Sequence, residues 1–361
     1  MKKQRLLALD VLRGMTIGGM ILVNSAGNWG HVYAPLSHSS WNGMTTADMI
    51  FPLFMFMMGI SMYISLKKFS FELHKALLMK ILRRTCLIFL IGVGIYAVAT
   101  YLNTGSLSGV RILGVLQRLA LCYGIGALTV TTVRHRYIPY LIIVLLLSYY
   151  VVLLLGNGFV YGPENILSYV DCSVLGMNHI YNDRGIDPEG ILSTLPSIAH
   201  VLTGFCFGKI CMEVRDMKDK LNKLFLYGSI CLLLGFALQD LCPINKKVWS
   251  PTFVGVTCGF SALLLAVLMW FIDVTGQYKR TRFWEVFGMN SLFCYVMSQL
   301  LYILADALPL SGKSVHGVVY SVLSGWVGDN AFASLLYACL FVGVVWLVGR
   351  YLYAKKIYIK I

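Results

Sequence analysis

The chain has 361 residues, of which 58% are hydrophobic and only 13% charged, and this balance excludes a soluble globular fold. Its net charge of +14 would suggest nucleic acid in a soluble protein, but in a membrane protein an excess of Lys and Arg in cytoplasmic loops explains it. The apolar stretches are continuous rather than alternating, which indicates helices and excludes barrel strands. We therefore predict an all-α, polytopic inner-membrane protein in which residues 1–361 form a single transmembrane domain.

Ten apolar segments approach the length of about 20 residues that a spanning helix needs. They are residues 6–26, 48–66, 84–102, 112–131, 137–155, 191–212, 222–241, 251–274, 283–305 and 331–353. An even number of crossings places both termini on one side. If that side is the cytoplasm, 23 of the 30 Lys and Arg residues lie inside, from Lys2, Lys3 and Arg5 at one end to Lys360 at the other. The positive-inside rule therefore predicts cytoplasmic N- and C-termini.

Two long outer segments, 27–47 and 156–190, are rich in Gly, Pro, Asn, Ser and Asp and are predicted to be functional loops. Residues 314–329 are weakly apolar and interrupted by glycines, which favours an interfacial segment. Most of the ten cysteines fall within apolar segments and are expected to be buried thiols. Cys172 and Cys242 alone lie on the outer side, and the sequence leaves undecided whether they form a disulfide.

The first span carries ionisable groups, which are costly in a membrane and mark functional-site candidates. Asp10 and Arg13 lie three residues apart on one helix face and are expected to pair. Asn24 follows eleven residues after Arg13 and points within about 20° of the same direction, so a polar stripe runs roughly 16 Å along the helix. The stripe is either a polar seam for helix packing or a conduit for a ligand. Asp10 and Arg13 also argue against a cleaved signal peptide.

The first outer loop brings a histidine close to a carboxylate. His38, Trp41 and Asn42 lie in this loop, and Asp48 opens the second span. A histidine beside an embedded carboxylate can be held in one tautomer and made more basic, as a general base or nucleophile requires. Asn24, His38 and Asp48 all fall at the outer ends of two consecutive spans. An exposed bystander histidine is the competing interpretation.

Further polar groups follow in the fourth span, the second outer loop and the ninth span. Arg111 and Arg118 are seven residues apart on one helix face, with Gln117 beside them, so Arg118 lies about 10 Å deeper and must face protein, water or an anion. Alternatively, Arg118 has a structural role and neutralises a carboxylate such as Asp48 or Asp10. The helix start expected before the sixth span lies at Asp187, Pro188 and Glu189. The two carboxylates of this stretch would also suit a cationic amine. Asn290 either forms a hydrogen bond between helices or lines the site.

Several of these stretches resemble the heparan-α-glucosaminide N-acetyltransferase family and its bacterial relatives. The resemblance is carried in the same order along nearly the whole chain by residues 10–14 (DVLRG), 23–24 (VN), 38–43 (HSSWNG), 47–52 (ADMIFP), 111–118 (RILGVLQR), 187–192 (DPEGIL), 245–250 (NKKVWS), 288–291 (GMNS) and 355–357 (KKI). It implies a transmembrane acyltransferase of the bacterial inner membrane. His38 matches the active-site histidine of the family, and Asn24 matches a neighbouring asparagine implicated in catalysis.

The resemblance implies transfer of acetyl from cytoplasmic acetyl-CoA to the amine of a glucosamine-type sugar on the outer side. We expect His38, Asn24 and Asp48 to be catalytic. CoA would be bound by Arg13, Asp10, Arg118 and Gln117, and the acceptor by Trp41, Asn42, Arg111, Asp187, Glu189 and Asn290. Acetyl-CoA is the donor substrate, and no metal is expected. An acetyl-histidine intermediate and direct transfer both stay open.

Two alternatives compete with this interpretation. An O-acyltransferase of a cell-surface polysaccharide would need the same donor chemistry. A transporter or flippase of a polar solute would also have intramembrane charges, although we find no internal repeat and no matching broken helices. The expected partners are membrane lipid, CoA and an amino-sugar or glycan acceptor, with a homodimer left open and nucleic acid not expected.

Overall fold

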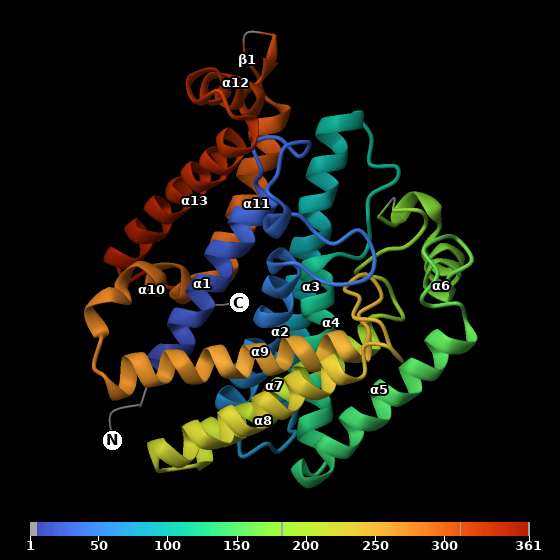
Figure 1. The fold of residues 1–361 in the computed structure, drawn as a ribbon, viewed down its shortest axis with the longest axis vertical. Coiled ribbons are helices and arrows are strands. Elements are labelled where there is room, and N and C mark those ends of the chain that lie inside the picture. The colour runs from blue at the N-terminus through green and yellow to red at the C-terminus, as the bar shows by residue number, and fades with distance from the viewer. Residues whose placement is uncertain (1–5, 182, 311, 360–361) are drawn as a thin grey trace. The chain divides into compact units, whose positions relative to one another are not determined.

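The computed structural model describes residues 6–181, 183–310 and 312–359, and helices dominate them (Figure 1). The α-helices are α1 (Leu7–Asn24), α2 (Thr46–Leu66), α3 (Lys75–Thr104), α4 (Val115–Thr132), α5 (Ile138–Leu155), α6 (Ile166–Leu175), α7 (Thr194–Glu213), α8 (Met217–Ala237), α9 (Pro251–Met269), α10 (Arg282–Met289), α11 (Ser291–Ala307), α12 (Val315–Val327) and α13 (Asn330–Ala354). Short 3-10 turns are η1 (Ala34–Leu36), η2 (Lys67–Phe69), η3 (His135–Tyr137), η4 (Met177–His179) and η6 (Tyr278–Arg280), and η5 (Trp270–Val274) is a π-helical end of α9. Strands β1 (Pro309–Leu310) and β2 (Lys313–Ser314) form a small antiparallel hairpin.

The predicted all-α membrane architecture is confirmed. Within the described ranges, nine helices are long and apolar enough to cross a membrane, and a tenth crossing results if the bent pair α10 and α11 is counted as one span. Each of the ten predicted spans corresponds to one of these crossings. The prediction of cytoplasmic termini stays a prediction, and Lys2, Lys3, Arg5 and Lys360, which support it, lie outside the described residues.

The ninth predicted span, 283–305, is wrong as a single helix because α10 and α11 meet at an angle of 82°. Asn290 lies at the break, buried, and its side chain donates to the carbonyl of Ile357 and accepts from the amide of Ile359. These bonds stabilise the break and use both polar ends of the Asn290 amide. Asn290 therefore holds the C-terminal segment, and the substrate contact expected from the sequence stays a prediction.

Glycines set the close contact between α1 and α10. An added Cβ on Gly14 would collide with the backbone of Trp284, and one on Gly288 would collide with the backbone carbonyl of Asp10. Small residues allow helix backbones to approach in this way, which replaces the hydrophobic driving force that is missing between helices in lipid. Since α1 also contacts α11 and α13, it is the central helix of its part of the molecule.

The chain divides into two compact units. The first contains the chain up to His38, Thr45–Phe54 and the chain from Val267 onward, and the second contains Ser39–Met44 and Met55–Ala266. Helices α2 and α9 each continue from one unit into the other. The expectation of a single domain stays a prediction, and the two units are described separately below.

In the second unit, α4 contacts both α3 and α7, and α5 contacts α7. The predicted loop 156–190 contains an unexpected helix, α6, whose first turn is capped by the side chain of Asn165 accepting from the amide of Leu167. Leu167 packs with Tyr149 and Leu153 of α5 and with Val248, so the segment 156–190 has its own small apolar core. The helix start expected at Asp187 is wrong, because α7 begins at Thr194.

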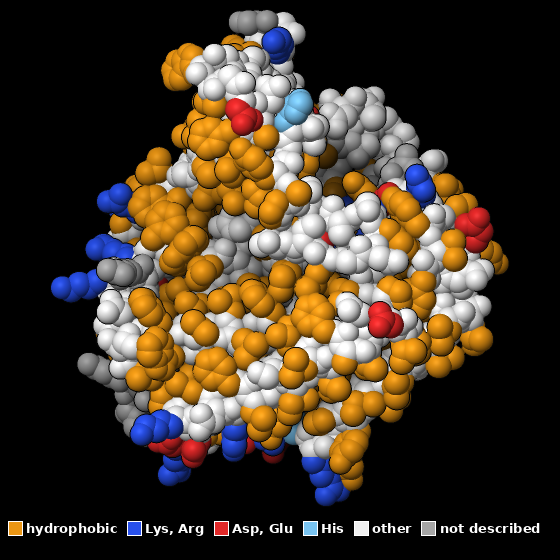
Figure 2. Space-filling model, in the orientation of Figure 1, with side chains coloured by type: hydrophobic (Ala, Val, Ile, Leu, Met, Phe, Trp, Pro, Cys, Tyr) orange, Lys and Arg blue, Asp and Glu red, His pale blue; other side chains and the backbone are white. Residues whose placement is uncertain are grey.

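The surface has the character expected of a membrane protein. Figure 2 shows hydrophobic side chains covering the face formed by α8 and α9, with Lys and Arg side chains gathered at the lower edge of the view. Helix α12, with 13 residues, falls short of a spanning length, in agreement with the prediction that 314–329 does not span. Cys172 and Cys242 are both free thiols, so the bridge left open between them is not formed.

Candidate active site

In the first unit, His38 and Asp48 form the hydrogen-bonded pair that the sequence predicted. Nδ1 of His38 lies 2.8 Å from Oδ1 of Asp48, and the side chain of Asp48 is 1% exposed while that of His38 is 46% exposed. An ionised Asp48 can only accept, so it holds the proton on Nδ1 and leaves the imidazole lone pair on Nε2. The arrangement therefore presents a basic nitrogen on a ring that solvent and a substrate can reach.

Asp48 is held in place by the beginning of α2. Its Oδ2 accepts from the backbone amide of Thr45 at 3.0 Å and lies 3.2 Å from the hydroxyl oxygen of Thr45. A carboxylate in the first helical turn that reaches back to the preceding amide is half of a capping box, and the positive end of the helix dipole favours its charge. The hydroxyl of Thr45 also donates to the carbonyl of Ser37 at 2.6 Å, which ties the histidine loop to the same helix end.

The other predicted residues of α1 lie in the same unit. Asp10 and Arg13 form the expected pair, with 3.1 Å between Oδ1 and Nη1, and both side chains are partly buried. Asn24 is the last residue of α1 and is partly buried where the chain leaves the helix toward the His38 loop. The polar stripe expected along the first span therefore lies on the central helix of the unit.

In the second unit, the predicted acceptor residues Arg111, Asp187 and Glu189 bind one another. Arg111 donates to both carboxylates, at 2.5 and 3.1 Å to Asp187 and at 2.7 Å to Glu189. Burial alone would raise the pKa of Glu189, but the guanidinium groups of Arg111 and Arg118 outweigh it and hold the pKa below its ordinary value. The acidic face expected from the sequence is therefore largely neutralised by Arg111.

Arg118 is completely buried, as its depth in the span predicted. It donates to the carbonyl of Gly190 at 3.0 Å and to the hydroxyl of Ser193, and its guanidinium lies 5.2 Å from the ring centre of Trp249. Within the described parts of the chain, its Nε and Nη1 and both polar atoms of the neighbouring Gln117 have no hydrogen-bond partner. The two residues expected to bind CoA thus lie in the interior of the second unit.

Beside this group lies Asp171, a carboxylate that the sequence analysis missed because α6 was not predicted. Oδ1 of Asp171 accepts from the amide of Ile191 at 2.8 Å, while its Oδ2 is buried without a hydrogen-bond partner among the described residues. Burial raises the pKa of Asp171 to about 6. Its charge is therefore sensitive to pH near neutrality.

Trp41 and Asn42 connect the loop between α1 and α2 to the rest of the second unit. Nε1 of Trp41 donates to the carbonyl of Phe159 at 2.9 Å, and its ring stacks on that of Tyr161 with centres 4.7 Å apart. Oδ1 of Asn42 accepts from the side chain of Asn245 at 3.2 Å. Tyr161 gave no signal in the sequence, since a single tyrosine in a polar loop is not distinctive.

The segment 245–250, one of the stretches that carry the family resemblance, forms a tight turn. Oδ1 of Asn245 accepts from the amide of Val248, and Trp249 adopts a left-handed conformation with φ 53° and is fully buried. Lys247 pairs with Asp183 at 2.6 Å. Burial acts to lower the pKa of Lys247, but the hydrogen bonds and charge of Asp183 and Tyr161 raise it above its ordinary value.

Comparison with known proteins identifies the family of the chain. Residues 5–237, more than half of the chain, match the family model described as heparan-alpha-glucosaminide N-acetyltransferase, catalytic. The mouse (Mus musculus) heparan-alpha-glucosaminide N-acetyltransferase is 29% identical over 99% of this chain and 60% of its own length. The human (Homo sapiens) protein of that name is 30% identical over 81% of this chain and 52% of its own length, so the chain spans roughly half to three fifths of these relatives. The chain therefore belongs to the heparan-alpha-glucosaminide N-acetyltransferase catalytic family.

Proposed function

We propose that this protein is a transmembrane acetyltransferase that moves acetyl from cytoplasmic acetyl-CoA to the amine of a glucosamine-type sugar on the other side of the membrane. The observation that carries the proposal is the 2.8 Å contact between His38 and a buried Asp48 that is itself fixed by Thr45. Family membership supports the acetyl transfer, and the multi-pass architecture supports a reaction that uses both sides of the membrane.

His38 is the proposed base. As the amine nitrogen of the sugar attacks the thioester carbonyl, a C–N bond forms, the C–S bond breaks and CoA leaves as a thiol. Nε2 of His38 takes the proton that the amine loses and returns it to the leaving sulfur. Asp48 stabilises the imidazolium that exists between these two proton transfers, because its carboxylate accepts the hydrogen bond from Nδ1.

The same pair also fits a two-step route. Nε2 of His38 would attack the thioester first and release CoA, and the acetyl-imidazole would then pass its acetyl to the amine. Both routes develop negative charge on the carbonyl oxygen, for which the side-chain amide of Asn24 is the proposed donor. Mass spectrometry after exposure to acetyl-CoA alone distinguishes them, since only the two-step route leaves an acetyl group on His38.

Arg13 and Asp10 are the proposed CoA contacts on the cytoplasmic side, where basic residues are expected to be plentiful. A guanidinium suits phosphate because it donates two parallel hydrogen bonds, and the pairing with Asp10 would hold it in place. Gln117 and Arg118 stay proposed CoA contacts, because several of their buried polar atoms have no hydrogen-bond partner among the described residues. For Arg111, Asp187 and Glu189 the mutual hydrogen bonds described above favour a scaffold role. In that role they shape the outer segment that would accept the sugar, together with Trp41 and Asn42.

The test is an acceptor screen in proteoliposomes, with acetyl-CoA on one side and glucosamine or its N-blocked analogue on the other. We expect acetylation of the free amine and none of the blocked sugar. His38→Ala should lower turnover at least about 10²-fold while the variant still binds CoA. Acetylation of the blocked sugar on a hydroxyl would instead identify an O-acyltransferase. Near wild-type transfer by His38→Ala would refute the proposed base, and movement of unmodified sugar without acetylation would support a transporter.

A further inference from the structure

In the first unit, the chain leaves α1 through a short stretch that the C-terminal helices contact. Asn24 is the last residue of α1, and residues 26–29 begin the loop that leads to His38. Helices α11 and α13 both contact α1 in this unit (Figure 1). The family model matches residues 5–237, so these two helices lie beyond the matched part of the chain. Their role in the site is therefore not contained in the family match.

Ser334 of α13 binds the backbone of Asn28 in both directions. Its hydroxyl oxygen accepts from the amide of Asn28 at 3.0 Å, and the hydroxyl donates to the carbonyl of Asn28 at 3.2 Å. The carbonyl of Ser334 accepts from the amide of Gly27 at 3.4 Å. Because Ser334 is 2% exposed, water is largely excluded from these bonds. Three bonds to two neighbouring residues fix both the position and the orientation of this stretch.

Close packing at Gly27 reinforces these bonds. A Cβ added to Gly27 would lie 2.8 Å from Cβ of Tyr337 and 2.9 Å from the ring of Tyr320. Carbon atoms without a bond between them do not approach so closely in a packed interior. Glycine at position 27 therefore lets the stretch lie directly against α12 and α13.

Tyr302 of α11 holds the two ends of the same stretch. Its hydroxyl accepts from Nε1 of Trp29 at 3.0 Å and donates to the carbonyl of Ala26 at 3.4 Å. Each of the residues 26–29 thus has a hydrogen bond to Tyr302 or to Ser334. We call this set of hydrogen bonds from Tyr302 and Ser334 the clamp.

We propose that Ser334 is a positioning residue for Asn24, which it holds in place through the clamp. The inference rests on the proposed function, in which the side-chain amide of Asn24 donates to the developing oxyanion. Such a donor must lie within about 2.7–3.1 Å of the oxyanion, and a misplacement of about 1 Å can lower the rate about 10²-fold. Asn24 ends a helix, where backbone carbonyls lack intrahelical partners and the last turn frays. The clamp begins two residues later and limits that motion.

Ser334→Ala removes the hydroxyl of the clamp and tests the proposal by steady-state kinetics in proteoliposomes. We expect kcat for acetyl transfer to glucosamine to fall about tenfold, with KM for acetyl-CoA changed by less than about threefold. The matched control is Ser324→Ala, because the hydroxyl of Ser324 donates to the carbonyl of Ser321 at 3.1 Å within α12 of the same unit. This control should have wild-type kinetics. Tyr302→Phe removes the other hydroxyl of the clamp and should lower kcat in the same way, by about threefold.

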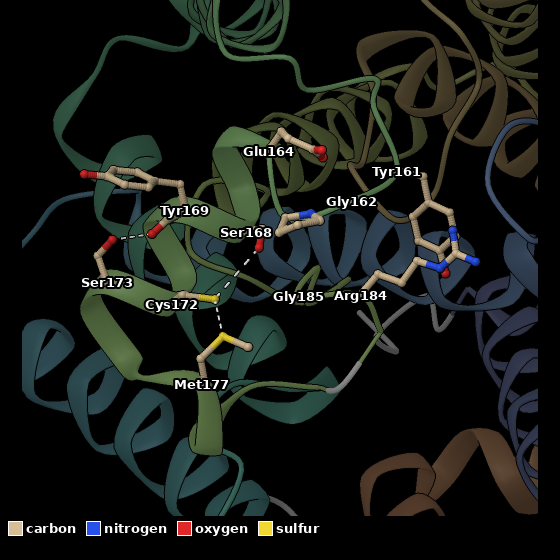
Figure 3. Close-up of a pocket in the computed structure, with 11 residues that line it drawn as sticks. Tyr161, Gly162, Glu164, Ser168, Tyr169, Cys172, Ser173, Met177, Arg184 and Gly185 are labelled. Atoms are coloured by element: carbon tan, nitrogen blue, oxygen red, sulfur yellow. Dashed lines mark hydrogen bonds between the residues drawn. The ribbon is translucent and has the colours of Figure 1, made fainter.

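The KM for glucosamine should also stay within about threefold of the wild-type value. The outer segment that would accept the sugar contains a cavity of about 880 Å³ among residues 161–185, and Figure 3 shows Tyr169 and Arg184 at its sides. This cavity lies in the second unit, and none of the described residues that line it belongs to the clamp. A rise of both KM values together with the fall in kcat would indicate a general distortion and would overturn the positioning role.

A double-mutant cycle with Asn24→Ala separates positioning from a general effect on the fold. If Ser334 acts through Asn24, Ser334→Ala should lower kcat by less than about twofold once Asn24 is already alanine. An equal tenfold loss in both backgrounds would assign Ser334 to the fold alone and overturn the proposal. Kinetics of Ser334→Ala that match those of Ser324→Ala would overturn it as well.

Hydrogen exchange tests the clamp without the reaction. In the full chain in lipid nanodiscs, Ser334→Ala should speed amide exchange in residues 26–29 about tenfold or more, because the Asn28 amide loses its acceptor, and Ser324→Ala should not. Faster exchange in a protein whose wild type acetylates no glucosamine would leave the clamp but remove the proposed reaction, and the positioning role with it. Acetylation by the wild type, with exchange and kcat unchanged in Ser334→Ala, would remove the positioning role and leave the reaction.

Discussion

Asp48→Asn tests the proposed mechanism most directly, because the hydrogen bonds of Asp48 dictate how the new amide must turn. Oδ2 of Asp48 accepts from the backbone amide of Thr45, a group that can only donate. The amide oxygen of the variant must therefore stay at this position, and its NH2 group must face Nδ1 of His38. Two donors cannot face each other, so Nδ1 loses its hydrogen and the imidazole adopts the tautomer that is protonated on Nε2.

The expected loss follows from this change of tautomer. The nitrogen that should take the proton from the amine already carries one, so general-base catalysis, which contributes about 10²–10⁴-fold, is removed. Loss of the charge-assisted hydrogen bond at 2.8 Å alone corresponds to about 1.5–3 kcal/mol, or roughly 10–100-fold. We expect kcat to fall about 10²–10⁴-fold, with KM for acetyl-CoA changed by less than about threefold because the substitution does not touch the proposed phosphate contacts.

The assay is acetyl transfer to glucosamine in proteoliposomes, with kcat and KM measured separately. Asp306→Asn is the matched control, since Asp306 lies 3.4 Å from Nδ1 of His316 in the same unit and belongs to no proposed site. That variant should keep wild-type kinetics. If Asp48→Asn retains a kcat within about threefold of the Asp306→Asn variant while remaining folded, the tautomer argument is refuted and Asp48 is only a helix cap.

Three further expectations follow from the structure. Arg13→Ala should weaken CoA binding by about 1.5–3 kcal/mol in a calorimetric titration, whereas unchanged affinity in a folded variant would assign Arg13 to its pair with Asp10 alone. Asp171→Asn should stabilise the protein at pH 8 but not at pH 4. Burial raises the pKa of Asp171 to about 6, so the folded protein keeps its full stability below about pH 4, where the carboxyl group is neutral. As the pH rises through 6 the buried carboxyl group ionises, which lowers the free energy of unfolding by up to about 3 kcal/mol. Thermal melting at both pH values measures this, and a pH-independent gap between variant and wild type would contradict it. A reporter inserted after the exposed Leu107 should report the outside. A reporter fused through a linker after the last residue should report the cytoplasm, and the opposite pattern would invert the predicted orientation.

The sequence predicted best those contacts that short separations determine. Asp10 and Arg13 lie about one helical turn apart, and His38 lies ten residues before Asp48, in a loop that ends at a recognisable helix start. In both cases the local backbone geometry nearly fixes the contact. The lengths of the apolar segments likewise determine the spans, because the thickness of the bilayer sets the length of the helix.

Contacts between distant parts of the chain could not be predicted in this way. Arg111 is 76 residues from Asp187, so the acidic loop looked available for an amine when it is in fact neutralised. The Arg118 contact to Gly190 spans 72 residues and depends on how α4 meets the loop before α7. Helix α6 was missed because the Gly, Pro, Asn and Asp residues around it outweighed an apolar segment of only 10 residues. Its stability comes from contacts with Tyr149 and Leu153 on another helix.

The contact between Asn290 and the residues after α13 has a practical consequence for handling the protein. Ile357 and Ile359 look like a dispensable tail in the sequence, yet their backbone groups satisfy a side chain that is 1% exposed. Trimming the chain before Ile357 would leave that amide unsatisfied, at a cost of about 1–3 kcal/mol. A purification tag attached there without a spacer would strain the junction that sets the angle between α10 and α11. Affinity tags and fluorescent fusions therefore belong behind a flexible Gly/Ser linker, which adds reach without imposing its own geometry.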